Sequence, residues 1–272
     1  MSPSPRREDP LAPLRRDDDC GVAILTLQSP ASRNALSLAM IESLLDALAA
    51  IEADPTTRVV VLAGEGPALS AGHDLKELQA HRNDVDRGRA FFERAMTRCA
   101  ELMRAIVALP KPVIAAVEGV ATAAGCQLVA ACDLAIAGAD ARFALPGVSI
   151  GLFCSTPLVA VSRAVSRKHA MEMALTGDLY DAQTAERFGL VNRVVPAGAA
   201  LGEAHTLARR IAARSTATLA IGKRTFYRQI DAPLDEAYAL AARAMVENLL
   251  HPDSAEGAAA FLDKRPPRWE GA

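Results

Sequence analysis

Ser70-Ala71-Gly72-His73-Asp74 is a turn of small residues, and Ala121-Thr122-Ala123-Ala124-Gly125-Cys126-Gln127 is a second turn of the same kind. An apolar stretch typical of a buried strand precedes each, at 59–63 and 113–117, and helical spacing follows each. We therefore expect backbone N–H groups to project from both turns. Two such groups that converge on one point form an oxyanion hole, which stabilises negative charge developing on a carbonyl or thioester oxygen.

Length and composition indicate a globular chain with a large core. The 272 residues are 51% hydrophobic, enough for one large domain or a domain with a helical appendage. The net charge of −2 provides no basic surface, so nucleic acid is not an expected partner. The most apolar segment, 120–139, contains Gln127 and Asp133 and is not expected to span a membrane.

The cysteines and the N-terminal segment indicate the cellular compartment in which the protein is expected. The five cysteines show no metal-ligand spacing, and we assign no metal site. Their odd number, without a secretory signal, predicts reduced thiols in the cytoplasm. Residues 1–19 combine prolines with many charges and predict a disordered tail, in which the acidic residues argue against an organellar import sequence.

The periodicity of the remaining chain predicts a mixed α/β body with crossover connections, followed by helices. Ser37 is a candidate N-cap of a helix with apolar residues at positions 41, 44, 45 and 48. A short buried helix is expected to begin near Ala124. The other elements expected in the body are strands at 21–28, 58–63, 113–117 and 134–137 and a long helix at 92–106.

Several separated motifs carry a resemblance to a known family. They are Ser32-Arg33-Asn34-Ala35-Leu36-Ser37, residues 68–78 around the first turn, residues 118–133 around the second, and Phe143 to Gly151. Over about residues 20–265, the sequence resembles the crotonase superfamily, that is, the enoyl-CoA hydratase/isomerase family. Within it, the sequence is most similar to the subgroup called enoyl-CoA hydratase domain-containing protein 3.

The resemblance implies a fold and a ligand. The fold would be a crotonase-like ββα superhelical spiral core over residues 20–195, with a C-terminal helical trimerisation region over 196–272. The ligand would be an acyl-CoA thioester, with coenzyme A as part of the substrate and no permanently bound cofactor. The chain would assemble as a homotrimer or a dimer of trimers.

The resemblance also implies which residues form the site. The backbone N–H groups of His73 and Ala124 would form the oxyanion hole. Phe261 and Lys264 match residues that often reach the coenzyme A site of a neighbouring subunit. The remaining residues matched to the coenzyme A region are Arg33, Ala71, Asp74, Leu75 and Lys76.

One departure from the family pattern bears directly on mechanism. Hydratases of the family use two glutamates, and these positions align with Gln127 and Gly147. An amide does not titrate near neutral pH and glycine has no side chain, so neither residue replaces a general acid or base. We expect a hydratase/isomerase-like protein without conventional two-glutamate hydration, or a non-catalytic acyl-CoA-binding or regulatory protein. Restoring both glutamates is expected to raise hydratase activity.

Other residues near the turns are weaker candidates for chemistry. The His73 imidazole either acts as a base or only lines the pocket. Ser155, beside Cys154, lies near the position of a nucleophile in related dehalogenases, although no partner base is visible in the sequence. Asp74 is expected to hold the first turn through hydrogen bonds.

Overall fold

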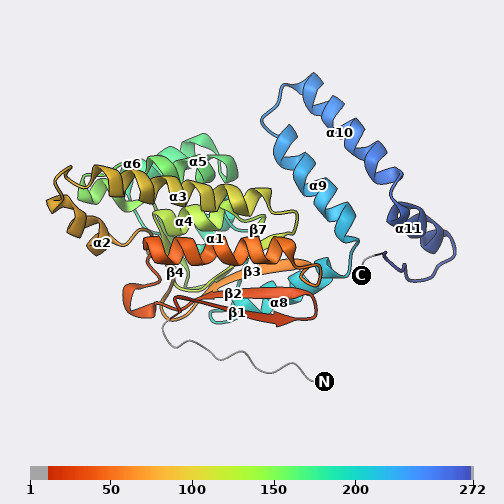
Figure 1. Cartoon of the computed structure of the whole chain (residues 1–272), viewed down its shortest axis with the longest axis horizontal. Helices are drawn as coiled ribbons and strands as arrows, with labels where there is room; N and C mark the ends of the chain where they lie inside the picture. The colour runs from red at the N-terminus through yellow and green to blue at the C-terminus, as the bar shows by residue number, and fades with distance from the viewer. Residues whose placement is uncertain (1–11, 271–272) are drawn as a thin grey trace.

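The computed structural model describes residues 12–270 and contains two sheets, a body of helices and a projecting C-terminal arm. Residues 1–11, most of the expected tail, lie outside the described residues. Figure 1 shows the sheets and helices α1 to α8 as one body, from which α9, α10 and α11 extend on one side. The expected class, a mixed α/β body with parallel strands and a C-terminal helical region, is confirmed.

The larger sheet has six strands in the order β1-β2-β3-β5-β7-β10. β1 pairs antiparallel with β2, and every other pair in this sheet is parallel. Both faces of its central strands are buried, which explains why they read as continuous apolar runs. The strands are β1 (Leu14–Asp19), β2 (Val22–Leu27), β3 (Val59–Gly64), β5 (Val113–Val117), β7 (Leu134–Gly138) and β10 (Arg193–Val195).

The smaller sheet has four strands in the order β4-β6-β8-β9, of which the first three are parallel. The sequence pattern did not predict these strands, because two or three residues are too few to show an alternating period. They matter most for the site, since β4 and β6 end at the two small-residue turns. The strands are β4 (Ala68–Ser70), β6 (Val120–Thr122), β8 (Arg142–Ala144) and β9 (Tyr180–Asp181).

Helices cover both faces of the larger sheet. α1 and α3 lie on one face, and α8 packs its alanines on the other against β3, β5 and β7. The helices of the body are α1 (Leu38–Ala53), α2 (Leu75–Ala80), α3 (Arg89–Ala108), α4 (Ala124–Ala131), α5 (Ser155–Ala164), α6 (Arg167–Thr176), α7 (Ala182–Phe188) and α8 (Ala200–Ala212). The arm consists of α9 (Thr216–Gln229), α10 (Leu234–Leu249) and α11 (Pro252–Leu262).

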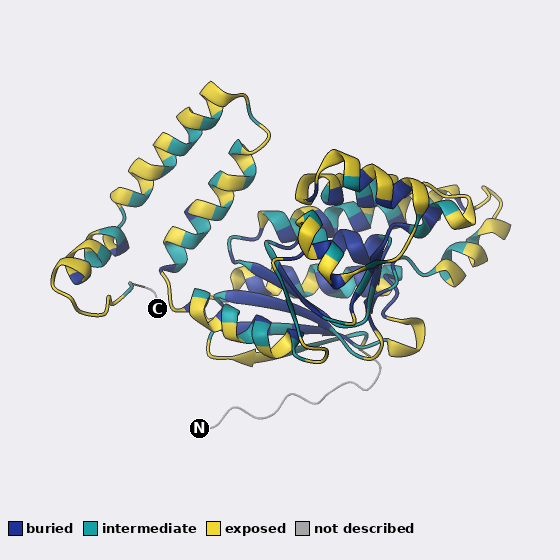
Figure 2. Ribbon diagram, turned by 180° about the vertical axis from the view of Figure 1, so that it is seen from behind, coloured by how far each residue is buried: buried dark blue, intermediate teal, exposed yellow. Residues whose placement is uncertain are grey.

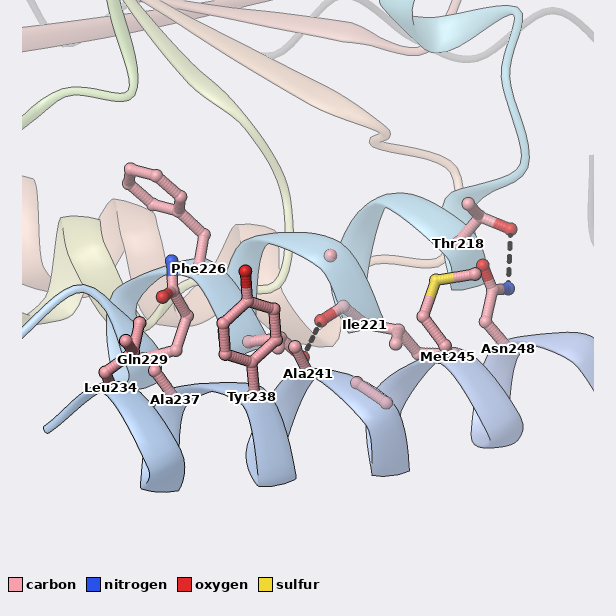
Figure 3. Close-up of a pocket in the computed structure, with 13 residues that line it drawn as sticks. Thr218, Ile221, Phe226, Gln229, Leu234, Ala237, Tyr238, Ala241, Met245 and Asn248 are labelled. Atoms are coloured by element: carbon pink, nitrogen blue, oxygen red, sulfur yellow. Dashed lines mark hydrogen bonds between the residues drawn. The ribbon is translucent and has the colours of Figure 1, made fainter. Parts of the chain in front are cut away.

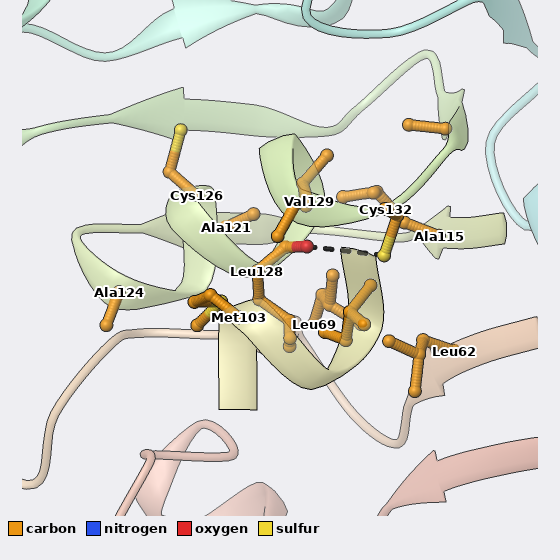
Figure 4. Packing of buried hydrophobic residues seen from close by; sticks show 14 of the residues in the cluster. Leu62, Leu69, Met103, Ala115, Ala121, Ala124, Cys126, Leu128, Val129 and Cys132 are labelled. Atoms are coloured by element: carbon orange, nitrogen blue, oxygen red, sulfur yellow. Dashed lines mark hydrogen bonds between the residues drawn. The ribbon is translucent and has the colours of Figure 1, made fainter. Parts of the chain in front are cut away.

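The sequence located the main elements of the body correctly. α1 begins after Ser37, whose side chain accepts a hydrogen bond from the Met40 amide, as expected of an N-cap. The short buried helix begins at Ala124. Figure 4 shows α4 packed among core side chains, with Cys126 and Cys132 buried among apolar neighbours.

The expectation of a disordered tail is wrong for residues 14–19, which form the edge strand β1. Leu14 packs against the core, while the charges that suggested disorder pair with one another and with the body. Arg16 donates to Asp18 at 2.8 Å and to Asp54 at 2.6 Å. An edge strand rich in charge is a common protection against edge-to-edge aggregation.

The boundary expected between core and C-terminal region also needs correction. α8 lies within residues 196–272, yet Ala200, Ala204 and Ala208 are fully buried against the larger sheet. The small alanine side chains let α8 approach the strands closely. The core therefore extends through α8, and the arm that leaves the body begins at α9 (Figures 1 and 2).

Candidate functional site

The two small-residue turns lie side by side because the strands before them are paired. β4 and β6 run parallel, with Ser70 opposite Ala121, so both chains turn at the same end of the smaller sheet. Gly72 has a φ of +88°, and a Cβ built on it would lie 2.9 Å from the Ala123 Cβ and 3.1 Å from the Ala124 nitrogen. Glycine is needed here both for the backbone conformation and for the close approach of the turns.

The amides expected to form the oxyanion hole are free. Neighbouring N–H groups are used: that of Ala71 donates to Arg33 and that of Ala123 to Ala144, at 3.0 and 2.9 Å. Among the hydrogen bonds of residues 12–270, none has the N–H of His73 or Ala124 as its donor. Ala124 is the first residue of α4, where N–H groups have no partner within the helix and the helix dipole favours an anion.

Two hydroxyl groups that the sequence analysis overlooked brace the turns. The Thr122 Oγ1 donates to the Ala71 carbonyl at 3.2 Å, and the Ser70 Oγ accepts from the Gly72 amide at 3.2 Å. Ser70 and Thr122 are each the last residue of a strand. A hydroxyl residue at this position was the signal in the sequence from which these two bonds could have been predicted. These bonds occupy the Ala71 carbonyl and the Gly72 amide and involve neither the His73 amide nor the Ala124 amide.

Ala123 has a backbone conformation that normally favours glycine. Its φ is +50° and its ψ is −118°, directly before α4. A non-glycine residue in such a region stores strain of about 1–3 kcal/mol, held by the surrounding structure.

Gln127 is a buried, uncharged group on the first turns of α4. Its side chain is 3% exposed, and its Oε1 lies 4.0 Å from the Cys99 Sγ on α3. Burial raises the pKa of the Cys99 thiol to about 12, so this neighbour is neutral at pH 7. The position that aligns with the first family glutamate therefore holds an amide beside a thiol, with no ionised group.

Gly147 lies where no larger side chain fits. A Cβ built on it would lie 2.5 Å from the Leu152 carbonyl oxygen and 2.9 Å from the Cys154 Sγ. A glutamate at 147 would require the loop from Gly147 to Cys154 to move, so the expected gain of hydratase activity from glutamates at 127 and 147 stays a prediction that depends on this movement. This loop closes with a backbone hydrogen bond from Leu152 to Gly147 at 2.9 Å.

The His73 ring is buried and incompletely paired. Its Nε2 is inaccessible to solvent and has no hydrogen-bond partner among the residues that the structure describes. Burial lowers the pKa of His73, and a hydrogen bond to the Leu36 backbone opposes that effect. The ring is therefore a neutral imidazole at pH 7.

Residues matched to coenzyme A lie around the start of α2. Asp74 caps this helix, accepting from the amides of Lys76 and Glu77 at 2.8 and 3.2 Å, which confirms its expected role in the turn. Leu75 and Lys76 are exposed beside a surface groove of about 640 Å³ that Gln79, Ala80 and Asn83 complete. The exposed Arg33 is held close to the first turn through its carbonyl bond to Ala71.

Two of the expected site residues, Phe261 and Lys264, are not gathered at the turns, and a third, Ser155, lacks a partner base. Ser155 is exposed at the start of α5, where its Oγ lies 3.5 Å from the Phe153 carbonyl and meets no base among residues 12–270. Phe261 and Lys264 lie at the end of the arm, and Phe261 is 83% exposed. A single chain therefore does not bring them to the site, and their contact with a neighbouring subunit stays a prediction.

Another cavity, of about 570 Å³, lies between α9 and α10, away from the turns (Figure 3). Mostly apolar side chains line it, and it contains no cluster of chemically reactive groups. No group of three His, Cys, Asp or Glu residues in the described part of the chain could hold a metal. No helix of that part is long and apolar enough to cross a bilayer.

Comparisons with known proteins show the family and the fold of the chain. Residues 17–272 match the family described as enoyl-CoA hydratase/isomerase. The mitochondrial enoyl-CoA hydratase domain-containing protein 3 of Rattus norvegicus is 45% identical over 97% of this chain and 86% of its own length. The crystal structure of the human protein of that name has a TM-score of 0.90 at 44% identity, covering 94% of this chain and 100% of the other. An enoyl-CoA hydratase structure from Mycobacterium smegmatis has a TM-score of 0.89 at 48% identity, covering 94% and 98%.

Proposed function

Since the chain belongs to the enoyl-CoA hydratase/isomerase family, of the crotonase fold, we propose that it binds acyl-CoA thioesters and polarises their carbonyl oxygen. The observation that carries the proposal is the meeting of the two turns, with unused N–H groups at His73 and Ala124. Two amides aimed at one oxygen stabilise the enolate form of a thioester. Substrates of this protein are accordingly thioesters whose chemistry passes through an enolate.

The proposal excludes a conventional hydratase mechanism. Hydration requires a group that activates water and a group that supplies a proton, and the two aligned positions hold Gln127 and Gly147. The steric block at Gly147 supports this, because no acidic side chain fits there. A non-catalytic acyl-CoA-binding protein remains the second candidate, favoured by this same lack of ionised groups.

The site is expected to be completed by neighbouring subunits, in a homotrimer or a dimer of trimers. Figure 2 shows that the arm projects from the body and that many residues of α9, α10 and α11 are exposed. Several of these exposed residues are apolar. Burying such a surface against a second copy would stabilise an assembly by about 25 cal/mol per Å². The exposed apolar residues of the arm include Phe226, Leu234, Tyr238, Met245, Val246, Leu249, Leu250, Phe261 and Leu262.

A cytoplasmic location stays a prediction for this chain. The Rattus norvegicus relative is mitochondrial by name.

Substituting Lys76 by alanine is expected to weaken the binding of butyryl-CoA and of free coenzyme A equally. The exposed ammonium of Lys76 would contact a phosphate in either ligand, and its loss corresponds to a decrease in affinity of up to about tenfold. Isothermal titration calorimetry measures both affinities, and Lys168→Ala on the exposed surface of α6 is the matched control.

The infrared stretching frequency of the thioester carbonyl is a second measurement that tests the proposed function. With a ¹³C-labelled carbonyl, butyryl-CoA bound to the protein or to Lys76→Ala should show the same lowered infrared stretching frequency, because the hole is intact in both. Absence of butyryl-CoA binding by the unmodified protein would contradict the proposed function. Binding without a frequency shift would contradict the oxyanion hole and leave only a binding role.

A further inference from the structure

We propose that Asn34 is a positioning residue of the oxyanion hole, because its buried side chain fixes the segment 33–36 that aims the His73 N–H. This inference deepens the proposed function and rests on it, since it concerns the same pair of free amides. Asn34 lies in the loop before α1 and acts through the backbone of the first small-residue turn, without touching the substrate.

The Asn34 carboxamide is completely buried and makes three hydrogen bonds. Its Oδ1 accepts from the Ser29 amide at 2.8 Å. Its Nδ2 donates to the backbone carbonyls of Ala68 at 2.8 Å and of Glu65 at 2.9 Å. These bonds tie the loop before α1 to the start of β4 and to the connection before it. Because one acceptor and two donors are all used, a primary amide satisfies all three partners.

The backbone and the space around Asn34 suit this residue type. Its φ is +52° and that of Arg33 is +55°, in the left-handed region that asparagine adopts more readily than most residues. A Cβ built on Gly64 would lie 2.9 Å from the Asn34 Nδ2, so glycine at 64 provides the room for the amide. The side chain is therefore closely enclosed where it lies.

The segment 33–36 is bonded to the first small-residue turn along its length. The Ala71 amide donates to the Arg33 carbonyl at 3.0 Å, and the Leu36 amide donates to the Gly72 carbonyl at 2.8 Å. Leu36 and His73 also form a parallel bridge. The segment thus pairs with the turn as a short strand would, and its position sets the orientation of the peptide groups there.

The bond from Leu36 determines which way the His73 N–H points. The peptide bonds of residues 12–270 are trans, so the Gly72 carbonyl and the His73 N–H point in opposite directions from their shared peptide. Since the carbonyl points at Leu36, the N–H points away from the segment 33–36.

The second turn lies on the side to which this N–H points. The Ala71 N–H donates into the segment 33–36. At the other end of the same peptide, the Ser70 carbonyl oxygen lies 2.1 Å from a Cβ built on Gly125 of α4. The side opposite the segment is therefore the side of α4. The His73 N–H is directed to that side, where the other free amide of the hole lies.

This brace matters because the peptide that it holds follows a glycine. Gly72 has a φ of +88° and no Cβ, so the peptide after it rotates more easily than after other residues. A rotated peptide would present the Gly72 carbonyl to the ligand and repel a negative oxygen. An oxyanion hole is effective because its donors are oriented before the ligand binds. Asn34 therefore contributes by keeping one of the two donors in place.

The infrared stretching frequency of the ¹³C-labelled carbonyl of bound butyryl-CoA tests this role. We expect Asn34→Gly to lose about half of the frequency shift seen with the unmodified protein, because one of the two donors is no longer held. Glycine adopts the left-handed region freely, so this variant removes the three side-chain bonds without backbone strain. Asn34→Asp keeps the oxygen that accepts from Ser29 but replaces the donating nitrogen, and should also reduce the shift.

Two control variants separate positioning from general effects on the fold. Cys20→Gly matches the backbone change, since Cys20 has a φ of +48° and is exposed in the turn between β1 and β2. Val22→Ala matches a loss of stability, since Val22 is buried on the side of the larger sheet that α8 covers. Both should retain the full shift. A shift reduced as much in Val22→Ala as in Asn34→Gly would overturn the proposal.

A crystal structure of the unmodified protein with butyryl-CoA is a second test, and it decides the matter should neither Asn34 variant fold or bind. The thioester oxygen should lie on the side of the peptide opposite Leu36, with the bond from Leu36 to the Gly72 carbonyl kept. A complex in which this bond is broken would overturn the role of Asn34.

Failure of this inference differs from failure of the proposed function. A frequency that the unmodified protein does not lower overturns the proposed oxyanion hole itself. A frequency that the unmodified protein and Asn34→Gly lower equally overturns the role of Asn34 alone.

Discussion

Gly125→Ala is expected to be among the most destabilising single substitutions in this protein. A Cβ on Gly125 would lie 2.1 Å from the Ser70 carbonyl oxygen and 2.8 Å from the Ser70 carbonyl carbon, both rigid backbone atoms of β4. The first turn of α4 would have to move away from β4, which separates the two halves of the oxyanion hole. Overpacking typically lowers the free energy of unfolding by about 1–3 kcal/mol, and a backbone clash of this size belongs at the upper end.

Urea unfolding followed by circular dichroism measures this loss of stability. Gly222→Ala is the matched control: Gly222 lies within α9, nothing lies within 4 Å of a Cβ built there, and alanine favours a helix over glycine by about 1 kcal/mol. We therefore expect Gly125→Ala to lower the free energy of unfolding and Gly222→Ala to raise it. If Gly125→Ala were as stable as the unmodified protein, the close contact between α4 and β4 described above would be incorrect.

Asp133→Ala is expected to loosen the junction between the arm and the body. The Lys223 ammonium on α9 donates to Asp133 at 2.7 Å and to the carbonyls of Ile106 and Lys111 at 2.9 and 3.0 Å. Asp133 also accepts from Tyr227 and from the Val113 amide. The side chains of Lys223 and Asp133 are only 7% and 17% exposed, so removing the carboxylate leaves a buried positive charge unpaired.

Breaking a buried pair from one side lowers the free energy of unfolding by about 3–5 kcal/mol. Hydrogen–deuterium exchange should show lost protection in α9 first, with β3 less affected. The double variant Asp133→Ala, Lys223→Met removes both charges and should recover part of the loss, by about 0.5–3 kcal/mol relative to the sum of the single effects. Unchanged protection of α9 in Asp133→Ala would show that other contacts hold the arm.

The sequence was most informative where apolar spacing and capping residues agree. Apolar residues with a period of 3.6 predict the helix capped by Ser37. A continuous apolar run predicts the buried strand at 113–117. It was least informative where distant pairing decides the structure. The strand β1 could not be recognised from Arg15 to Asp19, because its charges are neutralised by groups such as Asp54 that lie far along the chain.

In the candidate site, too, local sequence patterns were informative and contacts between distant residues were not predictable. The two turns could be found as small residues after apolar stretches, but their contact depends on β4 and β6, which are too short to show a period. The blocked space at Gly147 depends on Leu152 and Cys154, whose positions are set by tertiary packing. Such contacts cannot be read from local sequence.

A crystal structure of the protein with bound butyryl-CoA tests the oxyanion hole most directly. We expect the thioester oxygen within about 3.1 Å of both backbone nitrogens, those of His73 and Ala124, with each N–H directed at it. A bound ligand whose carbonyl oxygen contacts neither amide, or lies in the groove between α9 and α10, would contradict the account.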